Sequence, residues 1–190
     1  MPTRPLTILA ITGSLRTGSS NTRLLETCRQ FLPEGTNYSI LTCGDMPFYE
    51  SSLDGEIKPP AVHAFREAIE HADGLLISTP EYNYSVPGGL KNAIDWASRP
   101  GYASPLAHKP TGILSASGSV IGGARAQGHL KQILAATLSP VFPSPEFLVG
   151  EAGKKFDPDG KLTDEQTVAR LERYIHGFTA WVSRSLDDTV

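Results

Sequence analysis

Residues 6–11 read Leu-Thr-Ile-Leu-Ala-Ile, and residues 13–21 read Gly-Ser-Leu-Arg-Thr-Gly-Ser-Ser-Asn. The first run is typical of a short buried strand, and the polar stretch is typical of a loop that leads into a helix. Such a turn directs backbone N–H groups, hydroxyl groups and a helix N-terminus towards one point, where an anion is favoured. Arg16 adds a cation suited to charge-assisted hydrogen bonds. The stretch predicts a phosphate site, although an ordinary loop before an N-capped helix has a similar composition.

The spacing within this loop narrows the kind of phosphate. Gly13 and Gly18 are spaced as in a P-loop, but Ser19-Ser20 stands where that motif has Lys-[Ser/Thr]. Nucleoside triphosphate hydrolysis is therefore not expected. The dinucleotide pattern Gly-x-Gly-x-x-Gly lacks its second glycine here. A terminal monophosphate held by hydroxyl and amide groups fits better than a bridging pyrophosphate.

Strand-like and helical patterns alternate along the rest of the chain. We expect strands over residues 6–11, 38–41, 74–78, 111–115 and 146–149. We expect helices over residues 21–32, 59–72, 86–98 and 122–138, and a last helix that opens with a capping box at Thr163–Gln166. This alternation predicts a parallel sheet covered on both faces. The expected fold is a flavodoxin-like three-layer α/β/α sandwich with strand order 2-1-3-4-5, formed as one domain over residues 1–190 with its core at about 6–185.

Composition excludes several classes of function. The net charge of −3 over 190 residues provides no basic surface for nucleic acid or an anionic membrane. Cys28 and Cys43 form no CxxC motif and are interpreted as inert, reduced thiols, and the five histidines lack metal-ligand spacing, so no metal is expected. The sequence contains no apolar stretch of about 20 residues and no signal-peptide pattern, which predicts a soluble, cytoplasmic protein.

Two more loops follow expected strands at the same edge of the sheet. Residues 79–89 contain two tyrosines and an asparagine between prolines, which suits the face and carbonyl groups of a planar ring. Residues 115–123 are rich in glycine and serine, which lets the backbone approach a ligand closely. Alone, each has a plain alternative, an aromatic surface loop and a flexible turn. Together with the phosphate loop they predict a mononucleotide with a flat ring, FMN above all.

Three blocks of the sequence resemble the NADPH-dependent FMN reductases of flavodoxin-like fold, most closely the bacterial quinone and chromate reductase branch. The first block is Gly13-Ser14-Leu15-Arg16-x-Gly18-Ser19-x-Asn21. The second runs Pro-Glu-Tyr-Asn-Tyr-Ser-Val-Pro-Gly-Gly-Leu-Lys-Asn-Ala-Ile-Asp-Trp over residues 80–96, and the third is Gly-Gly-Ala-Arg at 122–125. The resemblance extends over about residues 6–180.

The resemblance implies a cofactor site made by all three loops. The implied FMN-binding residues are Ser14, Arg16, Ser19, Ser20 and Asn21 near the phosphate, Pro80, Glu81, Tyr82, Asn83, Tyr84 and Ser85 near the ring and ribityl chain, and Ser115, Ser117 and Gly118 at the remaining wall. From the residues alone, we expect Glu81 to be an exposed loop carboxylate and Trp96 to pack under the sheet.

The resemblance also implies a homodimer or homotetramer, with Arg125 and Glu146 at a subunit contact; a solvated helix arginine is the plain alternative for Arg125. The implied reaction is a two-electron, ping-pong transfer from NADPH or NADH through FMN to a small acceptor such as a quinone, chromate, an azo compound or free flavin. No protein nucleophile is expected because the cofactor supplies the chemistry. The alternatives are a flavodoxin-type electron carrier, which is usually more acidic, and a flavin-dependent redox sensor.

Overall fold

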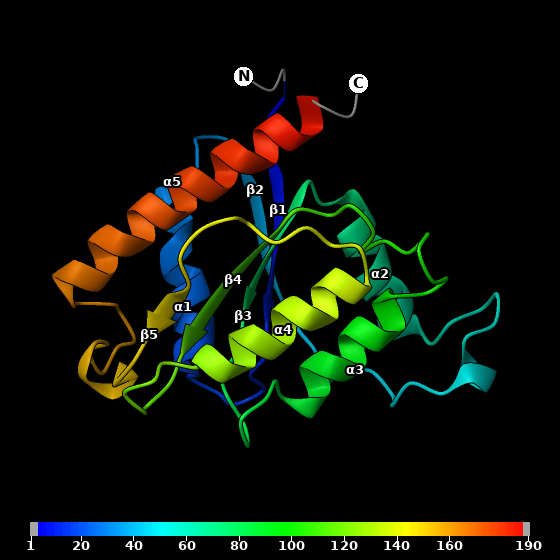
Figure 1. The fold of residues 1–190 in the computed structure, drawn as a ribbon, viewed down its shortest axis with the longest axis horizontal. Helices are drawn as coiled ribbons and strands as arrows, with labels where there is room; N and C mark the ends of the chain where they lie inside the picture. The colour runs from blue at the N-terminus through cyan, green and yellow to red at the C-terminus, as the bar shows by residue number, and fades with distance from the viewer. Residues whose placement is uncertain (1–3, 188–190) are drawn as a thin grey trace.

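A five-stranded parallel sheet forms the centre of the computed structural model, which describes residues 4–187; the ends of the predicted domain, residues 1–3 and 188–190, lie outside this range. The strands are β1 (Thr7–Thr12), β2 (Asn37–Thr42), β3 (Gly74–Ser78), β4 (Thr111–Ala116) and β5 (Phe147–Val149). Their order is β2-β1-β3-β4-β5, and all four pairings are parallel. The predicted fold class and strand order are confirmed (Figure 1).

Helices cover both faces of the sheet, as the alternating pattern predicted. They are α1 (Ser20–Cys28), α2 (Pro60–His71), α3 (Gly88–Ala97), α4 (Ala124–Ala136) and α5 (Glu165–Asp187). One face packs against α1 and α5, and the other packs against α2, α3 and α4 (Figure 1). Short 3-10 turns lie at Arg29–Phe31, Ser51–Leu53 and Ala152–Lys154.

The protein has two hydrophobic cores, one on each face of the sheet. The alternating directions of the side chains along β1 explain how one strand contributes to both. Ile8 and Ala10 pack in the core with α1 and α5, whereas Leu9 and Ile11 pack in the core with the other three helices. Successive side chains of a strand point to opposite faces, so a strand with apolar residues throughout is stable only when both faces are covered. Full burial of each large aliphatic side chain is worth roughly 1.5–3 kcal/mol.

Three helix ends differ from the predicted ones, and a glycine or a proline lies at or near each of them. The α-helical part of the first predicted helix ends at Cys28 and continues as a 3-10 turn to Phe31, before Pro33. The third helix begins at Gly88 rather than at residue 86, and Pro87 precedes its first residue. The fourth begins at Ala124 rather than at residue 122 because Gly122 and Gly123 have φ of 68° and 91°, outside the helical region.

The predicted capping box at Thr163–Gln166 is wrong. Asp164 caps α5: its carboxylate accepts a hydrogen bond from the backbone N–H of Thr167 at 2.9 Å. The hydroxyl of Thr163 instead donates to the carbonyl of Lys155 at 3.2 Å. A carboxylate is the stronger acceptor at a helix N-terminus, where it also interacts favourably with the dipole.

The long segment between β2 and α2 is attached to α3. Asn92 accepts a hydrogen bond from the N–H of Tyr49 at 2.7 Å and donates to the carbonyl of Pro47 at 2.9 Å. The indole N–H of Trp96 donates to the same carbonyl at 2.8 Å, and the ring is fully buried, in agreement with a packing role. Beyond these anchors the segment projects from the body of the protein (Figure 1), and Phe48 is largely exposed.

Within residues 4–187, no helix is long and apolar enough to cross a bilayer. The same range contains no cluster of three or more His, Cys, Asp or Glu side chains that could hold a metal ion. Cys28 and Cys43 are free and buried, and burial raises the pKa of both thiols, that of Cys43 to about 12. Both are therefore protonated at neutral pH and poor nucleophiles.

Candidate functional site

The loops after β1, β3 and β4 meet at one cavity of about 170 Å³. These strands are neighbours in the sheet, and the carboxyl ends of parallel strands lie at the same edge. Ten of the fourteen predicted site residues line this cavity: Ser14, Arg16, Ser19, Ser20, Asn21, Pro80, Glu81, Tyr82, Ser117 and Gly118. Ala116, which was not predicted, also lines it. The other four predicted residues, Asn83, Tyr84, Ser85 and Ser115, lie outside it.

The first loop ends at the N-terminus of α1. Ser19 is the N-cap, and its hydroxyl accepts a hydrogen bond from the N–H of Asn21 at 3.2 Å. Arg16 is exposed, and among residues 4–187 its guanidinium has no hydrogen-bond or ion-pair partner; the hydroxyl of Ser20 likewise makes no hydrogen bond within that range. A free cation, a free hydroxyl and a helix N-terminus together favour an anion.

Asn21 has a structural role that the sequence did not reveal. Its side chain is buried, donates to the carbonyl of Ala116 at 2.9 Å and accepts from the N–H of Ala116 at 2.9 Å. It also accepts from the hydroxyl of Ser78 at 2.9 Å. Although Asn21 lines the cavity, its amide therefore joins the start of α1 to β3 and β4.

The second loop contains a tight hairpin over residues 82–85. The N–H of Tyr82 donates to the carbonyl of Ser85 at 2.9 Å, and the N–H of Ser85 donates back at 3.0 Å. The two central residues, Asn83 and Tyr84, have φ of 48° and 69°. Both tyrosine side chains are more than half exposed. The hairpin thus presents two flat aromatic rings, of which that of Tyr82 lines the cavity.

Glu81 is not the exposed loop carboxylate that the residues alone favoured. Its side chain is only 12% exposed and pairs with the guanidinium of Arg125 at 3.0 Å. Its other oxygen accepts from the N–H groups of Arg125 at 3.0 Å and of Ala126 at 3.4 Å. Partial burial acts to raise the pKa of Glu81, but the Arg125 side chain and these N–H groups outweigh it and hold the pKa below its ordinary value. The Arg125 side chain is 38% exposed, and its guanidinium also lies 4.0 Å above the Tyr84 ring.

The third loop is fixed by Ser115 and by a residue that the sequence did not single out, Gln127. The Ser115 hydroxyl is fully buried, donates to the carbonyl of Gly122 at 2.6 Å and accepts from the Gln127 amide at 2.8 Å. A β-carbon on Gly123 would lie 2.8 Å from that of Ser115, so only glycine fits there. Ser115 therefore shapes the wall from behind, while Ser117 and Gly118 line the cavity.

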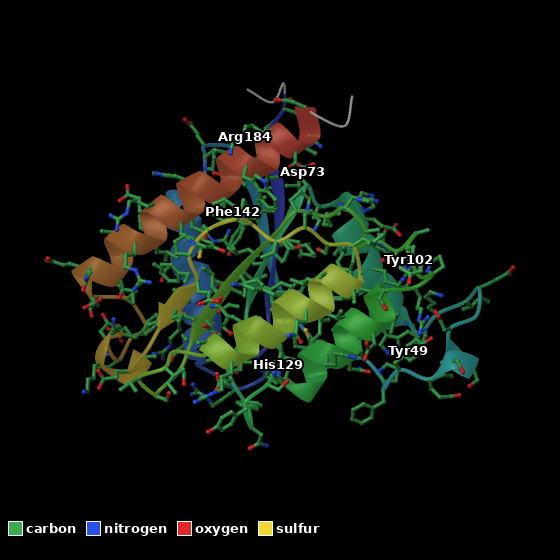
Figure 2. All side chains as sticks on the ribbon, in the orientation of Figure 1. Tyr49, Asp73, Tyr102, His129, Phe142 and Arg184 are labelled. Carbon is green, nitrogen blue, oxygen red and sulfur yellow. The ribbon has the colours of Figure 1, made fainter. Side chains whose placement is uncertain are left out.

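The histidines and Glu146, which the sequence analysis also considered, lie at the surface. All five histidines are exposed; that of α4, His129, has its Nδ1 2.9 Å from the hydroxyl of Ser85 (Figure 2). Glu146 forms an ion pair with Lys131 of its own chain at 2.8 Å.

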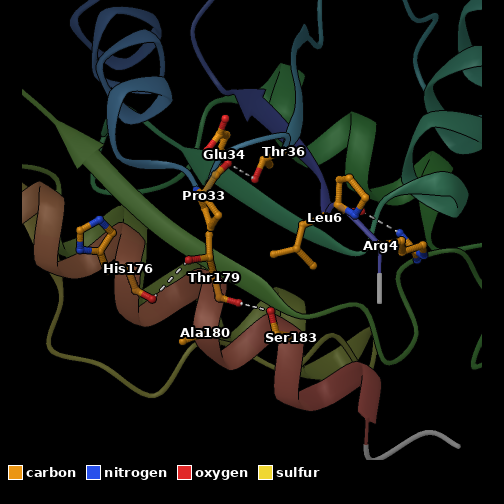
Figure 3. A pocket seen from close by; sticks show the side chains of 10 residues that line it. Arg4, Leu6, Pro33, Glu34, Thr36, His176, Thr179, Ala180 and Ser183 are labelled. Atoms are coloured by element: carbon orange, nitrogen blue, oxygen red, sulfur yellow. Dashed lines mark hydrogen bonds between the residues drawn. The ribbon is translucent and has the colours of Figure 1, made fainter. Parts of the chain in front are cut away.

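A larger cavity, of about 620 Å³, lies at the opposite edge of the sheet (Figure 3). It is bounded by Arg4, Pro5 and Leu6 before β1, by Pro33, Glu34 and Thr36 before β2, and by α5. The three loops at the carboxyl edge are absent from its lining. Size alone favours this cavity, but its polar groups are largely engaged within the fold. Arg4 is paired with Asp73, and the hydroxyls of Thr36, Thr179 and Ser183 donate to backbone carbonyls. The smaller cavity instead offers polar groups without partners among residues 4–187, which can orient a ligand.

Comparison with known proteins identifies relatives of this chain. The sequence model of the NADPH-dependent FMN reductase family matches residues 6–154. The chain is 41% identical over 177 residues to the NAD(P)H-dependent FMN reductase PA1204 of Pseudomonas aeruginosa, covering 93% of this chain and 95% of that protein. It is 43% identical over 183 residues to a quinone reductase of Escherichia coli, covering 94% and 96%.

A solved structure supports the same relationship. The flavoenzyme NAD(P)H:(acceptor) oxidoreductase FerB from Paracoccus denitrificans superimposes with a TM-score of 0.86 at 34% sequence identity. The alignment covers 94% of this chain and 98% of that one.

Proposed function

The chain belongs to the NADPH-dependent FMN reductase family, and from that premise we propose that its FMN lies at the carboxyl edge of the sheet, with the phosphate beside Arg16. The chain is an FMN-dependent NAD(P)H oxidoreductase of the kind that reduces quinones or flavin. The observation that carries the site assignment is the meeting of three loops at one cavity next to a guanidinium without a partner in the described chain.

The residues that line the cavity fit the phosphate end of FMN. A phosphate dianion would be bound by Arg16, by the hydroxyls of Ser14 and Ser20, and by the first N–H groups of α1. The Ser19 hydroxyl, already used as the helix cap, would support this end indirectly. The volume of about 170 Å³ suits the phosphate and part of the ribityl chain rather than a whole ligand, for which about 300 Å³ or more is usual.

The ring would lie against the second loop. Pro80 and Tyr82 line the cavity, and Asn83, Tyr84 and Ser85 continue the same loop outward from it. Ser117 and Gly118 would border the ribityl chain or the ring edge. Ser115 and the side chain of Asn21 would act from behind, by holding the loops in place.

Bound FMN supplies two-electron transfer, accepting hydride from NAD(P)H and passing reducing equivalents to the acceptor. The protein binds the phosphate, orients the ring through the 80–85 loop and leaves room beside it for the nicotinamide and then the acceptor. The exposed ring of Tyr82, and the face of the Tyr84 ring that Arg125 does not cover, provide apolar surface on which such flat molecules can stack.

The range of acceptors, the reductant, the oligomeric state and the location in the cell are proposed from the family resemblance. Chromate, azo compounds and free flavin are proposed as acceptors in addition to quinones, with NADPH or NADH as the transient reductant. A homodimer or homotetramer with Arg125 and Glu146 near a subunit contact, and a cytoplasmic location, are proposed on the same basis.

The site assignment is tested by comparing FMN with riboflavin, which lacks the phosphate. Arg16→Ala should raise the dissociation constant of FMN by about 10-fold or more, because a charge-assisted hydrogen bond is worth roughly 1.5–3 kcal/mol, and should leave that of riboflavin nearly unchanged. Arg184→Ala, on the exposed side of α5, is the matched control (Figure 2). If Arg16→Ala weakens the binding of FMN and riboflavin equally, or of neither, the phosphate assignment is ruled out.

The reaction is tested on the purified protein without oxygen. A flavin band near about 450 nm that NADPH bleaches directly is expected of a two-electron reductase. A flavin that NADPH leaves oxidised, and that stops half-reduced on chemical titration, indicates an electron carrier. Reduction too slow for turnover, together with a flavin-dependent interaction, indicates a sensor.

A further inference from the structure

The first turn of α4 is bonded to two of the three cofactor loops. Glu81, from the loop after β3, accepts hydrogen bonds from the N–H groups of Arg125 and Ala126. Gln127, one residue further along, donates to Ser115 of the loop after β4 and to the carbonyl of Phe147 at 2.9 Å. Helix N-terminal N–H groups lack partners within the helix, so Glu81 satisfies groups that would otherwise be unpaired. The position of this turn and that of the loops are therefore linked.

Arg125 extends the link to the tip of the hairpin. Its guanidinium is paired with Glu81 at 3.0 Å and lies 4.0 Å above the ring of Tyr84. Stacking on an aromatic face is favourable for a planar cation. Glu81 thus fixes the orientation in which Arg125 can cover Tyr84.

Tyr84 requires such a restraint. At φ of 69° it occupies the left-handed region, which glycine and asparagine adopt readily and a bulky aromatic residue does not. Strain of this kind persists only where the surroundings hold the backbone in place. Two contacts to α4 do so here: Arg125 over the Tyr84 ring, and the Nδ1 of His129 at 2.9 Å from the Ser85 hydroxyl.

We propose that Glu81 is a positioning residue for the flavin ring: it holds Arg125 and the first turn of α4 so that the 82–85 hairpin keeps its strained shape. This inference rests on the proposed function, because it assumes that the ring lies against that hairpin. Glu81 lines the cavity, but this role needs no contact between its carboxylate and the ring. It acts through Arg125 and Tyr84.

The variant Glu81→Gln preserves size and one hydrogen-bond acceptor but removes the charge that holds Arg125. It should raise the dissociation constants of FMN and of riboflavin by a similar factor, about 5- to 20-fold, since the change affects the ring end. Arg16→Ala, in contrast, should affect FMN alone. Glu67→Gln, an exposed carboxylate of α2, is the control and should change neither constant.

A double-variant cycle separates positioning from a general loss of structure. Tyr84→Gly removes both the strain and the ring that Arg125 covers. In that background, Glu81→Gln should change riboflavin binding by less than 2-fold. Independent, multiplicative effects of the two substitutions would overturn the proposal, because Glu81 would then not act through Tyr84.

The hairpin can also be followed without any flavin. In the flavin-free protein, Glu81→Gln should increase the rate of chymotrypsin cleavage after Tyr82 and Tyr84 several-fold, with no comparable increase at Tyr102. If Glu81→Gln only lowers the unfolding midpoint while both flavin affinities and the cleavage rate stay unchanged, Glu81 is a helix cap and the proposal fails. If Arg16→Ala does not distinguish FMN from riboflavin, the proposed function fails instead.

Discussion

The side-chain amide of Asn21 and the backbone of Ala116, 95 residues apart in the sequence, exchange two hydrogen bonds of 2.9 Å each. The same amide oxygen accepts from Ser78 at the end of β3. One buried side chain at the start of α1 therefore sets the spacing between the loop after β1 and the end of β4. The width of the cavity depends on this contact.

Asn21→Ala should lower the free energy of unfolding by about 2–4 kcal/mol, because each buried group left unsatisfied costs roughly 1–3 kcal/mol. It should also weaken FMN binding, since the loops lose their fixed spacing. Urea denaturation and flavin titration measure the two effects. Ser20→Ala is the control: Ser20 lines the same cavity, but its hydroxyl makes no hydrogen bond within residues 4–187, so stability should be unchanged. A loss below about 0.5 kcal/mol for Asn21→Ala contradicts the structural role.

Asp73 is expected to make the stability of the fold depend on pH under acidic conditions. It accepts two hydrogen bonds from the Arg4 guanidinium, at 2.6 and 2.8 Å, and one from the N–H of Thr7 at 2.8 Å. Burial acts to raise the pKa of Asp73, but these bonds outweigh it and hold the pKa below the ordinary value of 3.8. The carboxylate therefore stabilises the fold above about pH 4, and this contribution is lost as pH falls through the lowered pKa.

Asp73→Asn should cost about 1–2 kcal/mol at pH 7, where hydrogen bonds to a charged group are lost. The difference from the wild type should shrink when unfolding is measured at pH 3. Asp73 lies at the end of the sheet away from His129 and the candidate site (Figure 2), so flavin affinity should not change. A difference in stability that is the same at pH 7 and pH 3 would show that the charge of Asp73 is not involved.

Local patterns made the fold predictable, together with the edge of the sheet at which three unusual loops meet. The uninterrupted apolar run over residues 6–11 requires cover on both faces, and strands alternating with helices leave few topologies other than a parallel sheet. Parallel strands bring the loops after β1, β3 and β4 to one edge. Glycine- and serine-rich composition then pointed to the loops after β1 and β4, and two tyrosines and an asparagine between prolines pointed to the loop after β3.

Contacts between distant residues were not predictable from these patterns. Nothing near Glu81 in the sequence indicates that it pairs with Arg125, 44 residues later, so its carboxylate was interpreted as exposed. Ser115 looked like a ligand donor because serine is polar, but the bend of Gly122 brings a carbonyl to its hydroxyl. The capping residue of α5 was misassigned because Thr163 and Asp164 are both good caps, and their tertiary partners decided between them.

Asn92 should control the order of the segment between β2 and α2. Asn92→Ala removes the hydrogen bonds to Tyr49 and Pro47, leaving the carbonyl of Pro47 with Trp96 alone. Chymotrypsin should then cleave after Phe48 or Tyr49 several-fold faster. Asp95→Ala, on the same helix with its carboxylate paired to exposed Lys91, is the control and should leave the cleavage rate unchanged. An unchanged rate in Asn92→Ala means that other contacts hold the segment.

Glu146→Lys tests the proposed subunit contact. Glu146 and Lys131 are both about 40% exposed, and an ion pair at such a site contributes only about 0–1 kcal/mol, so the variant should still fold. If Glu146 faces a partner subunit, reversing its charge should shift the protein to a smaller species in sedimentation velocity. Glu172→Lys, exposed on α5, makes the same charge change elsewhere and should not. A wild-type protein that sediments as a monomer contradicts the proposed oligomer, whereas an unchanged oligomer in Glu146→Lys removes only Glu146 from the contact.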